Sequence, residues 1–424
     1  MLSIRLVRES PDEVRKNLQR RSDHSFLKML DELIEADKKW RSNLQEMERL
    51  KHEKNIATER VASLKRQGKS ADSEIRKIKD IPEKIKAVEK NTGNYSDKVN
   101  SLLMRLPNLL HSTVPEGRDE SENQTARTWG KKQKFAFQPK DHIDIGVPKG
   151  WIDIEHAAKI SGARFFFLKG PVALLDMALM HYAWDFMFKQ GFTPVWPPFM
   201  MKRKPYEGVV DLSDFGNVMY KIEGEDLYMI ATSEHPLTAQ HTDEVLDANG
   251  LPLLYSGFST NFRKEAGTHG KDTKGIFRVH QFNKVEQIVI CRPEDSWKWH
   301  ERLIQNAEKF FQSLQLPYRV VNICTGDIGT VAAKKYDLDV WLPGQGKYRE
   351  AVSCSNCTEY QSRRLNIRYR EKEGAPPAGF AHTLNSTLVT DRGVIAILEN
   401  FQQKDGSVLI PKVLQPYLGM KKIA

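Results

Sequence analysis

The feature that most constrains the fold is a stretch from about residue 25 to residue 110 that is rich in Lys and Glu and carries almost no glycine. Apolar residues in its second half recur at alternating spacings of three and four, which is the a/d seam of a coiled coil. The residues of this seam are Ile78, Ile81, Ile85, Val88, Thr92, Tyr95, Val99, Leu102 and Leu106. A matching seam in the first half shifts register once, and its residues are Leu30, Leu33, Trp40, Leu44, Met47, Leu50, Ala57, Val61 and Leu64.

The two halves of this stretch are separated by Gln67-Gly68-Lys69-Ser70, which interrupts the apolar pattern. Two helices of ~35–40 residues joined by a tight turn form an antiparallel hairpin, and each helix is roughly 55 Å long at 1.5 Å per residue. Pro82 lies inside the second seam and is predicted to kink that helix or delay its regular start. We therefore predict a coiled-coil hairpin over about residues 26–106, within an N-terminal domain of residues 1–110.

Basic residues crowd around the predicted tip of this hairpin. They are Arg60, Lys65, Arg66, Lys69, Arg76, Lys77 and Lys79, and the acidic residues among them are Glu59, Asp72, Glu74 and Asp80. A solvated coiled-coil surface usually mixes the two signs, whereas a basic tip on a protruding arm suits a phosphate backbone. The cluster alone leaves both interpretations open, although a formal net charge of +10 favours a polyanionic partner.

The rest of the chain divides into a polar segment and a compact domain. Residues 114–133 are polar and poor in apolar side chains, which is typical of a linker or surface loop, and we place the linker at 111–140. From 141 to 424, glycine, proline and aromatic residues become frequent, as in a compact catalytic domain.

The sequence carries no sign of a membrane or an oxidising compartment. No apolar run reaches the ~18 residues needed to span a bilayer, and the N-terminus lacks the apolar segment of a secretory signal. The cysteines, Cys291, Cys324, Cys354 and Cys357, are too few for a disulfide framework in a chain of 424 residues. We therefore expect a cytoplasmic protein with no membrane partner.

The densest cluster of polar residues is Asn261–Gln287. Residues 261–263 and 276–287 alternate well enough to be strands, and the glycine-rich residues 267–275 form the loop between them. Such a hairpin places four charged residues on one sheet: Arg263, Glu265, Arg278 and Glu286. Arginine clamps phosphate or carboxylate through two hydrogen bonds. A salt-bridged surface hairpin fits less well, because the charges stand beside Phe277, Phe282 and Val285.

Common nucleotide and metal signatures are missing from the sequence. Neither a GxxxxGK[ST] loop nor an HExxH helix is present, so any nucleotide chemistry uses another architecture. Cys354 and Cys357 have CxxC spacing without a second such pair, which favours buried thiols over a zinc site. Gly344-Gln345-Gly346 is too short for a nucleotide signature and is interpreted as a tight turn.

These motifs resemble those of a known enzyme family. Asn261–Gln287, with its FRKEAG and GIFRVHQFNKVEQ segments, resembles motif 2 of class II aminoacyl-tRNA synthetases in the form typical of the seryl branch. Gly191–Pro198 resembles motif 1, and Arg392 with Ala396–Asn400 resembles motif 3. The resemblance covers essentially the whole chain, because the N-terminal helical hairpin is also a feature of the seryl branch.

The resemblance implies an α+β protein in which the hairpin precedes an antiparallel β-sheet domain flanked by helices. We expect about six strands in that sheet, and not a doubly wound parallel sheet. The implied reaction activates L-serine with ATP to seryl-adenylate and transfers the seryl group to the 3′ end of tRNA(Ser). Motif 1 implies a homodimer with residues 194–198 near its interface. The basic hairpin tip, with Arg60, Lys65, Arg66, Lys69, Arg76 and Lys77, is the expected tRNA contact.

The resemblance also assigns residues to ATP. It implies catalytic roles for Arg263 at the α-phosphate, Arg392 on the γ-phosphate side and Glu350 as a ligand of Mg²⁺, with Ser353 as a second ligand. Glu265 would recognise adenine and Phe282 would stack under it. The complete expected ATP set is Arg263, Lys264, Glu265, Arg278, Val279, Phe282, Glu350, Ala351, Val352, Ser353 and Arg392.

The serine site is assigned in the same way. The expected set is Thr232, Ser233, Glu234, Arg263, Glu286, Asn385 and Thr387. The resemblance gives Glu286 the serine ammonium and Thr387 the serine side chain. Thr387 and Arg392 are five residues apart, one fewer than in the family pattern, so Ser386 is the alternative to Thr387.

Two other functions fit parts of this pattern. A catalytically inactive relative kept as a binding protein should have lost Arg263, Glu286, Glu350 or Arg392, and all four are present. A ligase that charges a carrier protein should lack the tRNA-binding hairpin, which is present at full length. The sequence leaves open whether tRNA(Sec) is also charged.

Overall fold

A computed structural model describes residues 1–265 and 275–424. The chain forms two compact units, Met1–Pro107 and Asn108–Ala424. The predicted loop residues 267–274 lie outside the described residues.

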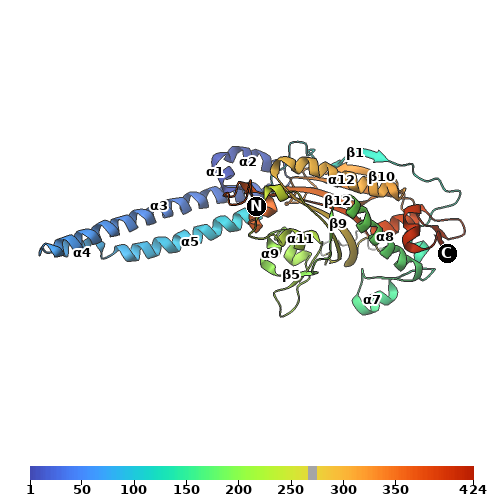
Figure 1. Cartoon of the computed structure of the whole chain (residues 1–424), viewed down its shortest axis with the longest axis horizontal. Coiled ribbons are helices and arrows are strands. Elements are labelled where there is room, and N and C mark those ends of the chain that lie inside the picture. Colours follow the sequence, from blue (N-terminus) through green and yellow to red (C-terminus); the bar gives the residue numbers. More distant parts are fainter. Residues whose placement is uncertain (266–274) are drawn as a thin grey trace. The chain divides into compact units, whose positions relative to one another are not determined.

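The N-terminal unit is built on a helical hairpin. Helices α1 (Ile4–Glu9) and α2 (Pro11–Leu18) precede the long α3 (Ser25–Arg66), which is followed by α4 (Asp72–Ile78) and α5 (Ile81–Arg105). Helices α3 and α5 lie side by side in opposite directions (Figure 1), and the ion pairs Lys51–Glu89 and Lys98–Glu32 join them. Every residue of the two predicted seams is buried or half-buried, so the predicted coiled-coil hairpin is confirmed.

The second arm of the hairpin is interrupted near its start. Helix α4 ends at Ile78, and α5 begins at Ile81 with Pro82 in its first turn. The first turn of a helix needs no partner for its backbone N–H groups, so proline is tolerated there and not further along. Pro82 therefore delays the regular helix, as its position in the seam predicts.

The C-terminal unit contains an eight-stranded sheet within the described residues. Its order is β1 (Gln124–Trp129), β10 (Tyr318–Asn322), β11 (Lys334–Leu342), β12 (Lys347–Thr358), β15 (His382–Thr390), β9 (Gln281–Cys291), β8 (Leu253–Phe262) and β4 (Thr193–Val195). All neighbouring strands are antiparallel except β4 and β8. The predicted antiparallel sheet flanked by helices is confirmed, with eight strands and not about six.

The two additional strands are the edges of the sheet. Strand β1 lies within residues 111–140, which the sequence predicts to be a linker, and it pairs with β10. Strand β4 is three residues long and pairs in parallel with β8 inside the predicted motif 1 segment. Short edge strands of this kind depend on the neighbour that they pair with, since their own patterns are weak.

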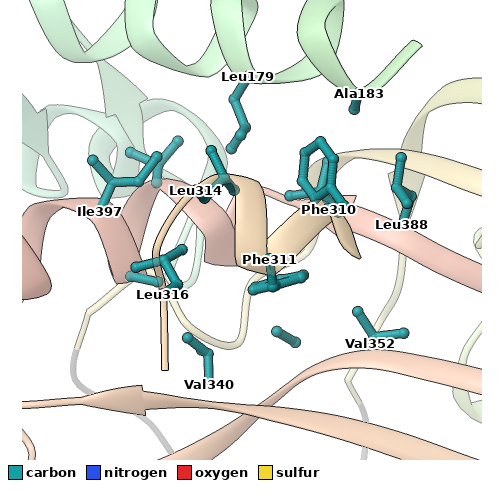
Figure 2. Close-up of a cluster of buried hydrophobic side chains, with 14 of the residues drawn as sticks. Leu179, Ala183, Phe310, Phe311, Leu314, Leu316, Val340, Val352, Leu388 and Ile397 are labelled. Carbon is teal, nitrogen blue, oxygen red and sulfur yellow. The ribbon is translucent and has the colours of Figure 1, made fainter. Parts of the chain in front are cut away.

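Helices pack onto the sheet through a large apolar core. Figure 2 shows Leu179 and Ala183 of α8 (Gly170–Lys189) facing Phe310 and Leu314 at the end of helix α12 (Ser296–Ser313) and its C-cap. Ile397 of α14 (Arg392–Asn400) and sheet residues including Val340, Val352 and Leu388 belong to the same core. Burial of this apolar area is the main force that holds helices and sheet together.

The remaining elements of the C-terminal unit are short. They are α6 (His142–Gly146), α7 (Glu155–Ser161), α9 (Arg203–Glu207), α10 (Asp214–Asn217), α11 (Glu234–Ala239), α13 (Tyr360–Leu365), α15 (Gln415–Leu418), β2 (Ile152–Asp153), β3 (Phe167–Leu168), β5 (Met200–Met201), β6 (Tyr228–Met229), β7 (Val245–Asp247), β13 (Arg368–Arg370), β14 (Gly379–Phe380), β16 (Val408–Leu409) and β17 (Lys422–Ile423), with 3₁₀ turns at Glu120–Glu122, Ala248–Gly250, Pro293–Asp295 and Lys412–Leu414.

Candidate active site

A cavity of about 360 Å³ lies on the sheet and is lined mostly by polar side chains. The lining residues are Thr232, Glu234, Arg263, Glu265, Ile276, Phe277, Arg278, Val279, Phe282, Lys284, Glu286, Lys335, Glu350, Ala351, Ser353, Asn385, Thr387, Thr390, Asp391 and Arg392. They come from β9, β11, β12, β15, the starts of α11 and α14, the segment just before α11, and the segments that follow β8 and precede β9.

Strand alternation separates this cavity from the core. Along β9, Lys284 and Glu286 line the cavity while Val285 and Val289 belong to the apolar core. Because successive side chains of a strand point to opposite faces, one strand supplies both. The same alternation on β15 places Asn385 and Thr387 in the cavity and Leu384 in the core.

Arg392, the first residue of α14, is held by two carbonyl groups. Its Nη1 donates to the Glu350 carbonyl at 2.7 Å, and its Nε donates to the Phe277 carbonyl at 3.4 Å. Its guanidinium lies 4.2 Å from the centre of the Phe277 ring, and that of Arg349 lies 3.7 Å from the same ring. Burial lowers the pKa of Arg392, but an arginine stays charged under such a shift. The arginine is thus fixed in place with its charge retained.

The Glu350 carboxylate lies beside this arginine. Its Oε1 is 3.6 Å from Arg392 Nη1, and its side chain is 48% exposed. Desolvation acts to raise the pKa of Glu350, but the positive charges of Arg392 and Lys335 outweigh it and the pKa lies below its usual value. Glu350 is therefore an ionised oxygen ligand at the rim of the cavity.

Two further arginines come from the segments on either side of residues 266–274. Arg263 donates through Nε and Nη2 to the Ala231 carbonyl, at 3.3 Å and 3.2 Å, and its guanidinium lies 5.1 Å from the Phe282 ring centre. Arg278 Nη1 contacts Glu265 Oε2 at 2.8 Å. Together with Arg392, these side chains give the cavity a concentrated positive charge that suits a polyphosphate.

A second group of side chains in the cavity centres on Glu286. Thr387 donates its hydroxyl to Glu286 Oε2 at 3.0 Å, and Lys284 Nζ lies 2.7 Å from the same oxygen. Lys284 and Glu286 are almost fully buried, and burial lowers the pKa of Lys284. Such a buried, hydrogen-bonded cluster can recognise a small zwitterion by its charges and its hydroxyl group.

Glu234 belongs to the same part of the cavity. Gln361 Nε2 donates to its Oε1 at 2.8 Å. Burial and the negative charge of Glu286 raise the pKa of Glu234 to about 7. This carboxyl group is therefore about half protonated near neutral pH, and a cation bound beside it would favour its ionised form.

Most residues predicted from the sequence meet in this one cavity. Those that line it are Thr232, Glu234, Arg263, Glu265, Arg278, Val279, Phe282, Glu286, Glu350, Ala351, Ser353, Asn385, Thr387 and Arg392. The side chains of Lys264, Ser233 and Val352 do not line it. Lys264 Nζ lies over the Tyr220 ring, Ser233 donates to the Gly257 carbonyl at 3.2 Å, and Val352 packs in the core. Strand alternation along β12 turns Val352 away from the cavity, whereas Lys264 and Ser233 lie outside the strands and are held by the contacts just described.

The structure also distinguishes Thr387 from Ser386, the alternative residue for facing the serine side chain. Ser386 is fully buried, and its hydroxyl donates to the Thr387 carbonyl at 3.1 Å. It does not line the cavity, whereas the Thr387 side chain does.

The predicted strand over residues 276–287 is shorter than expected. Strand β9 begins at Gln281, and residues 276–280 form no regular structure. The backbone N–H of Arg263 donates to the His280 carbonyl at 2.9 Å, and the N–H of His280 donates to the Arg164 carbonyl. The chain leaves the ladder here, so that Ile276, Phe277 and Val279 form a wall of the cavity.

Several lining residues were not predicted, and Lys284 and Lys335 are the most important. Lys284 follows Asn283 and precedes Glu286 and Gln287 in β9, so its polar neighbours do not mark it as a buried charge. Lys335 on β11 lies 3.2 Å from Asp337. Little in the sequence indicates that Lys335 lines a cavity, because the nearby charged residues Lys334 and Asp339 are typical of a solvated edge strand.

The thiol and membrane predictions can be compared with the structure directly. All four cysteines are buried and free in the described structure, as expected for buried thiols. Within residues 1–265 and 275–424, no group of three or more His, Cys, Asp or Glu side chains is placed to hold a metal. None of the described helices is long and apolar enough to cross a membrane.

Two family models match the chain. Residues 1–110 match the seryl-tRNA synthetase N-terminal domain. Residues 219–401 match the class II core domain of the tRNA synthetases for G, H, P, S and T.

Relatives match over nearly the full length. The serine–tRNA ligase of Methanocella arvoryzae is 52% identical, with 99% of both chains covered. The structure of seryl-tRNA synthetase from Pyrococcus horikoshii complexed with ATP is 47% identical and superposes with a TM-score of 0.97, covering 100% of this chain and 99% of that one. The cytoplasmic serine–tRNA ligase of Naegleria fowleri in complex with AMP is 36% identical, with a TM-score of 0.91 over 100% of this chain and 98% of that one.

Proposed function

The chain belongs to the seryl-tRNA synthetase family, and from this premise we propose how its cavity is divided between ATP and serine. It is a class II serine–tRNA ligase. One observation carries the division: a single cavity joins the arginine group of Arg263, Arg278 and Arg392 to the buried cluster around Glu286.

ATP occupies the arginine part of the cavity. The solved relatives from P. horikoshii and N. fowleri hold ATP and AMP, which supports this use of the cavity. Arg392 takes the γ-phosphate side, and Arg263 takes the α-phosphate. Adenine stacks on Phe282 and is recognised by Glu265. Backbone contacts with Val279 and with residues 350–353 complete the site.

Mg²⁺ accompanies ATP at Glu350 and Ser353. A carboxylate and a hydroxyl are the hard oxygen ligands that Mg²⁺ prefers, and this ion commonly binds through one or two protein oxygens together with substrate phosphates. Both side chains line the cavity, and the lowered pKa of Glu350 keeps it ionised. When bound, the ion adds positive charge that offsets charge developing on the phosphates.

Serine occupies the part of the cavity around Glu286. Glu286 and Glu234 attract its ammonium, Arg263 draws its carboxylate toward the α-phosphate, and Thr387 faces its side chain. Thr232 and Asn385 complete the walls. A buried site that bonds the hydroxyl rejects alanine, because its polar groups would lose their partner. A small site rejects threonine by its extra methyl group.

Activation then proceeds by in-line attack. A serine carboxylate oxygen forms a bond to the α-phosphorus, and the bond from that phosphorus to pyrophosphate breaks. Little covalent chemistry is asked of the protein, which aligns two anions and stabilises charge at the α-phosphate. We assign both tasks to Arg263, and its contacts with the Ala231 carbonyl and the Phe282 ring, which set its direction, support this assignment. In the second step a hydroxyl of the terminal tRNA ribose attacks the seryl carbonyl, the new ester bond forms, and the bond from that carbonyl to the adenylate phosphate breaks to release AMP.

The N-terminal unit binds tRNA(Ser) through the tip of its hairpin, and residues 141–424 carry out activation. The tip residues Arg60, Lys65, Arg66, Lys69, Arg76 and Lys77 are all exposed. Lysine and arginine at the tip of a helix pair suit the phosphate backbone of a folded RNA, and such contacts read few bases.

The enzyme acts as a homodimer in the cytoplasm. Large apolar side chains are exposed on α8 and next to β4: Leu174 is 55% exposed, Met177 61%, Phe188 65% and Trp196 66%. Exposed apolar side chains on α8, together with Trp196 within residues 194–198, support an interaction surface in this region. The free cysteines and the cytoplasmic relative from N. fowleri support the compartment.

Substitution of Arg263 tests the proposed division of the cavity. Arg263→Ala should reduce serine-dependent ATP–pyrophosphate exchange by roughly 10²–10³-fold, because a preorganised charge donor at the reacting phosphate is lost. Arg203→Ala is the matched control, since Arg203 is exposed and pairs with Glu207 on the surface. Near-normal exchange in a folded Arg263→Ala protein would show that the assignment of motif 2 is incorrect.

A further inference from the structure

A buried histidine–glutamate pair lies behind the cavity wall formed by residues 276–279. The side chain of His142, the first residue of α6, is 4% exposed, and that of Glu399 on α14 is fully buried. Glu399 Oε1 lies 3.0 Å from His142 Nδ1 and also accepts from the His142 backbone N–H. Glu399 Oε2 accepts from the N–H of Gly344 at 3.0 Å. Neither side chain lines the cavity, and the proposed mechanism assigns neither a role.

The partners of His142 determine which ring nitrogen carries its proton. The backbone N–H of Ile276 points at Nε2, with 3.4 Å between the nitrogens, so Nε2 is the acceptor. Nδ1 then carries the proton and donates to Glu399. In a doubly protonated ring, the N–H at Nε2 would face the backbone N–H of Ile276, and two donors cannot form a hydrogen bond. The neutral ring protonated at Nδ1 is therefore the form that satisfies both partners.

The chain before Ile276 approaches this ring closely. Gly275 has a φ of +92°, and a Cβ there would lie 2.6 Å from His142 Nε2. Only glycine combines that backbone conformation with the approach, so the backbone at residues 275 and 276 rests directly on the imidazole.

Two routes lead from this pair to the proposed phosphate arginine. Ile276 is followed by Phe277, whose carbonyl accepts from Arg392 Nε and whose ring lies under both Arg392 and Arg349. The second route runs through the Gly344-Gln345-Gly346 turn. Gln345 donates to Glu399 at 3.1 Å and accepts from Arg349 Nη1 at 3.1 Å. Both routes converge on the Phe277 ring.

We propose that His142, oriented by Glu399, is a positioning residue for the ATP part of the reaction. Its Nε2 fixes the backbone at Ile276, which places Phe277 and through it the guanidinium of Arg392. This inference rests on the proposed assignment of Arg392 to ATP. His142 makes no contact with the cluster around Glu286. Its substitution should therefore change the KM for ATP and leave the KM for serine nearly unchanged.

Two conservative variants of the full-length enzyme test the inference. Glutamine places its amide where Nε2 lies and keeps an acceptor for Ile276, whereas asparagine ends near Nδ1 and leaves Ile276 without its acceptor. In ATP–pyrophosphate exchange, His142→Asn should raise the KM for ATP about fivefold to tenfold, the loss expected for one buried hydrogen bond. His142→Gln should stay within about threefold of the wild type, and both should keep the KM for serine within about twofold.

The controls separate this role from general destabilisation. His156 forms a similar pair with Asp153 at 2.9 Å, but its side chain is 64% exposed, so His156→Ala should behave like the wild type. Equal increases in both KM values, or equal behaviour of the asparagine and glutamine variants, would overturn the inference.

If His142→Asn does not fold, Gln345→Ala provides the test, because Gln345 lies in a half-buried turn and links Glu399 to Arg349. An unchanged KM for ATP in that variant refutes the positioning role. Arg392→Ala, assayed in parallel, distinguishes failure of the positioning role of His142 from failure of the assignment of Arg392 to ATP. An unchanged KM for ATP in Arg392→Ala would refute the assignment of the cavity itself, and the inference with it.

Discussion

The ionisation of Glu234 gives the cavity a pH dependence that can be calculated. Burial and the nearby Glu286 raise its pKa from an ordinary value of 4.5 to about 7. The raised value means that the protonated, neutral form of Glu234 predominates below about pH 7. In the proposed serine site the ammonium group of the substrate favours the ionised form, so serine binding at lower pH must first remove a proton. The affinity for serine should therefore fall as the pH falls below about 7 and level off above it.

The size of the effect follows from the ionised fraction. With a pKa of about 7, about a tenth of the Glu234 carboxyls are ionised at pH 6 and about nine tenths at pH 8. Apparent affinity scales with the fraction of the protein in the competent state. The KM for serine, measured by ATP–pyrophosphate exchange at saturating ATP, should therefore be about tenfold higher at pH 6 than at pH 8. The KM for ATP should change little over the same range.

Two variants decide whether Glu234 is the group responsible. Glu234→Gln should raise the KM for serine at every pH and remove its dependence on pH, because an amide does not titrate. Asp214→Asn is the matched control: burial and the nearby Asp211 raise the pKa of Asp214 to about 6, but Asp214 does not line this cavity. A serine KM that keeps its pH dependence in Glu234→Gln, or loses it in Asp214→Asn, would refute the reasoning.

The remaining predictions concern assembly and tRNA. Light scattering at micromolar concentration should give about twice the chain mass of 48.7 kDa, and a monomer would contradict the proposed interface. Replacing residues 27–108 by a short linker should leave serine adenylation largely intact while aminoacylation collapses. An equal loss of both activities would show that the arm is structural. Charge reversal at Arg60, Lys65, Arg66 and Arg76 should weaken tRNA binding and flatten its salt dependence, because fewer counterions are released.

The helical hairpin could be predicted from the sequence because its information is local. A seam of apolar residues at spacings of three and four determines both the helices and the face that each buries. The burial of Leu33, Leu50, Val99 and Leu102 follows from that spacing alone. Pro82 adds a local rule of its own, since a proline fits only the first turn of a helix.

The edges of the sheet could not be predicted, because they depend on partners far away in the sequence. Strand β1 has the sequence QTARTW, which carries little apolar character, and most of its residues stay exposed. It becomes a strand because β10 offers an unpaired edge. In the same way β4 is a strand by virtue of its pairing with β8.

The charged residues of the site were predictable to different degrees. Arg263 and Glu286 stand in a dense and specific motif, so their convergence on one cavity was expected. Lys284 belongs to the same motif, yet nothing in its identity reveals that it is buried against Glu286. A lysine is usually solvated, and only the burial of both faces of β9 makes this one part of the site.

The relation between Thr387 and Arg392 shows why spacing alone could not decide which side chain faces the cavity. In a regular strand, Thr387 shares a face with residue 389, and residue 390 lies on the other face. The register between β15 and β9 shifts between Thr387 and Val389, which makes Leu388 an extra residue opposite β9. Leu388 and Val389 therefore both enter the core, while Thr387 and Thr390 both line the cavity. A bulge of this kind re-aims the side chains that follow it, and Arg392 enters the cavity from a chain that this shift has already turned.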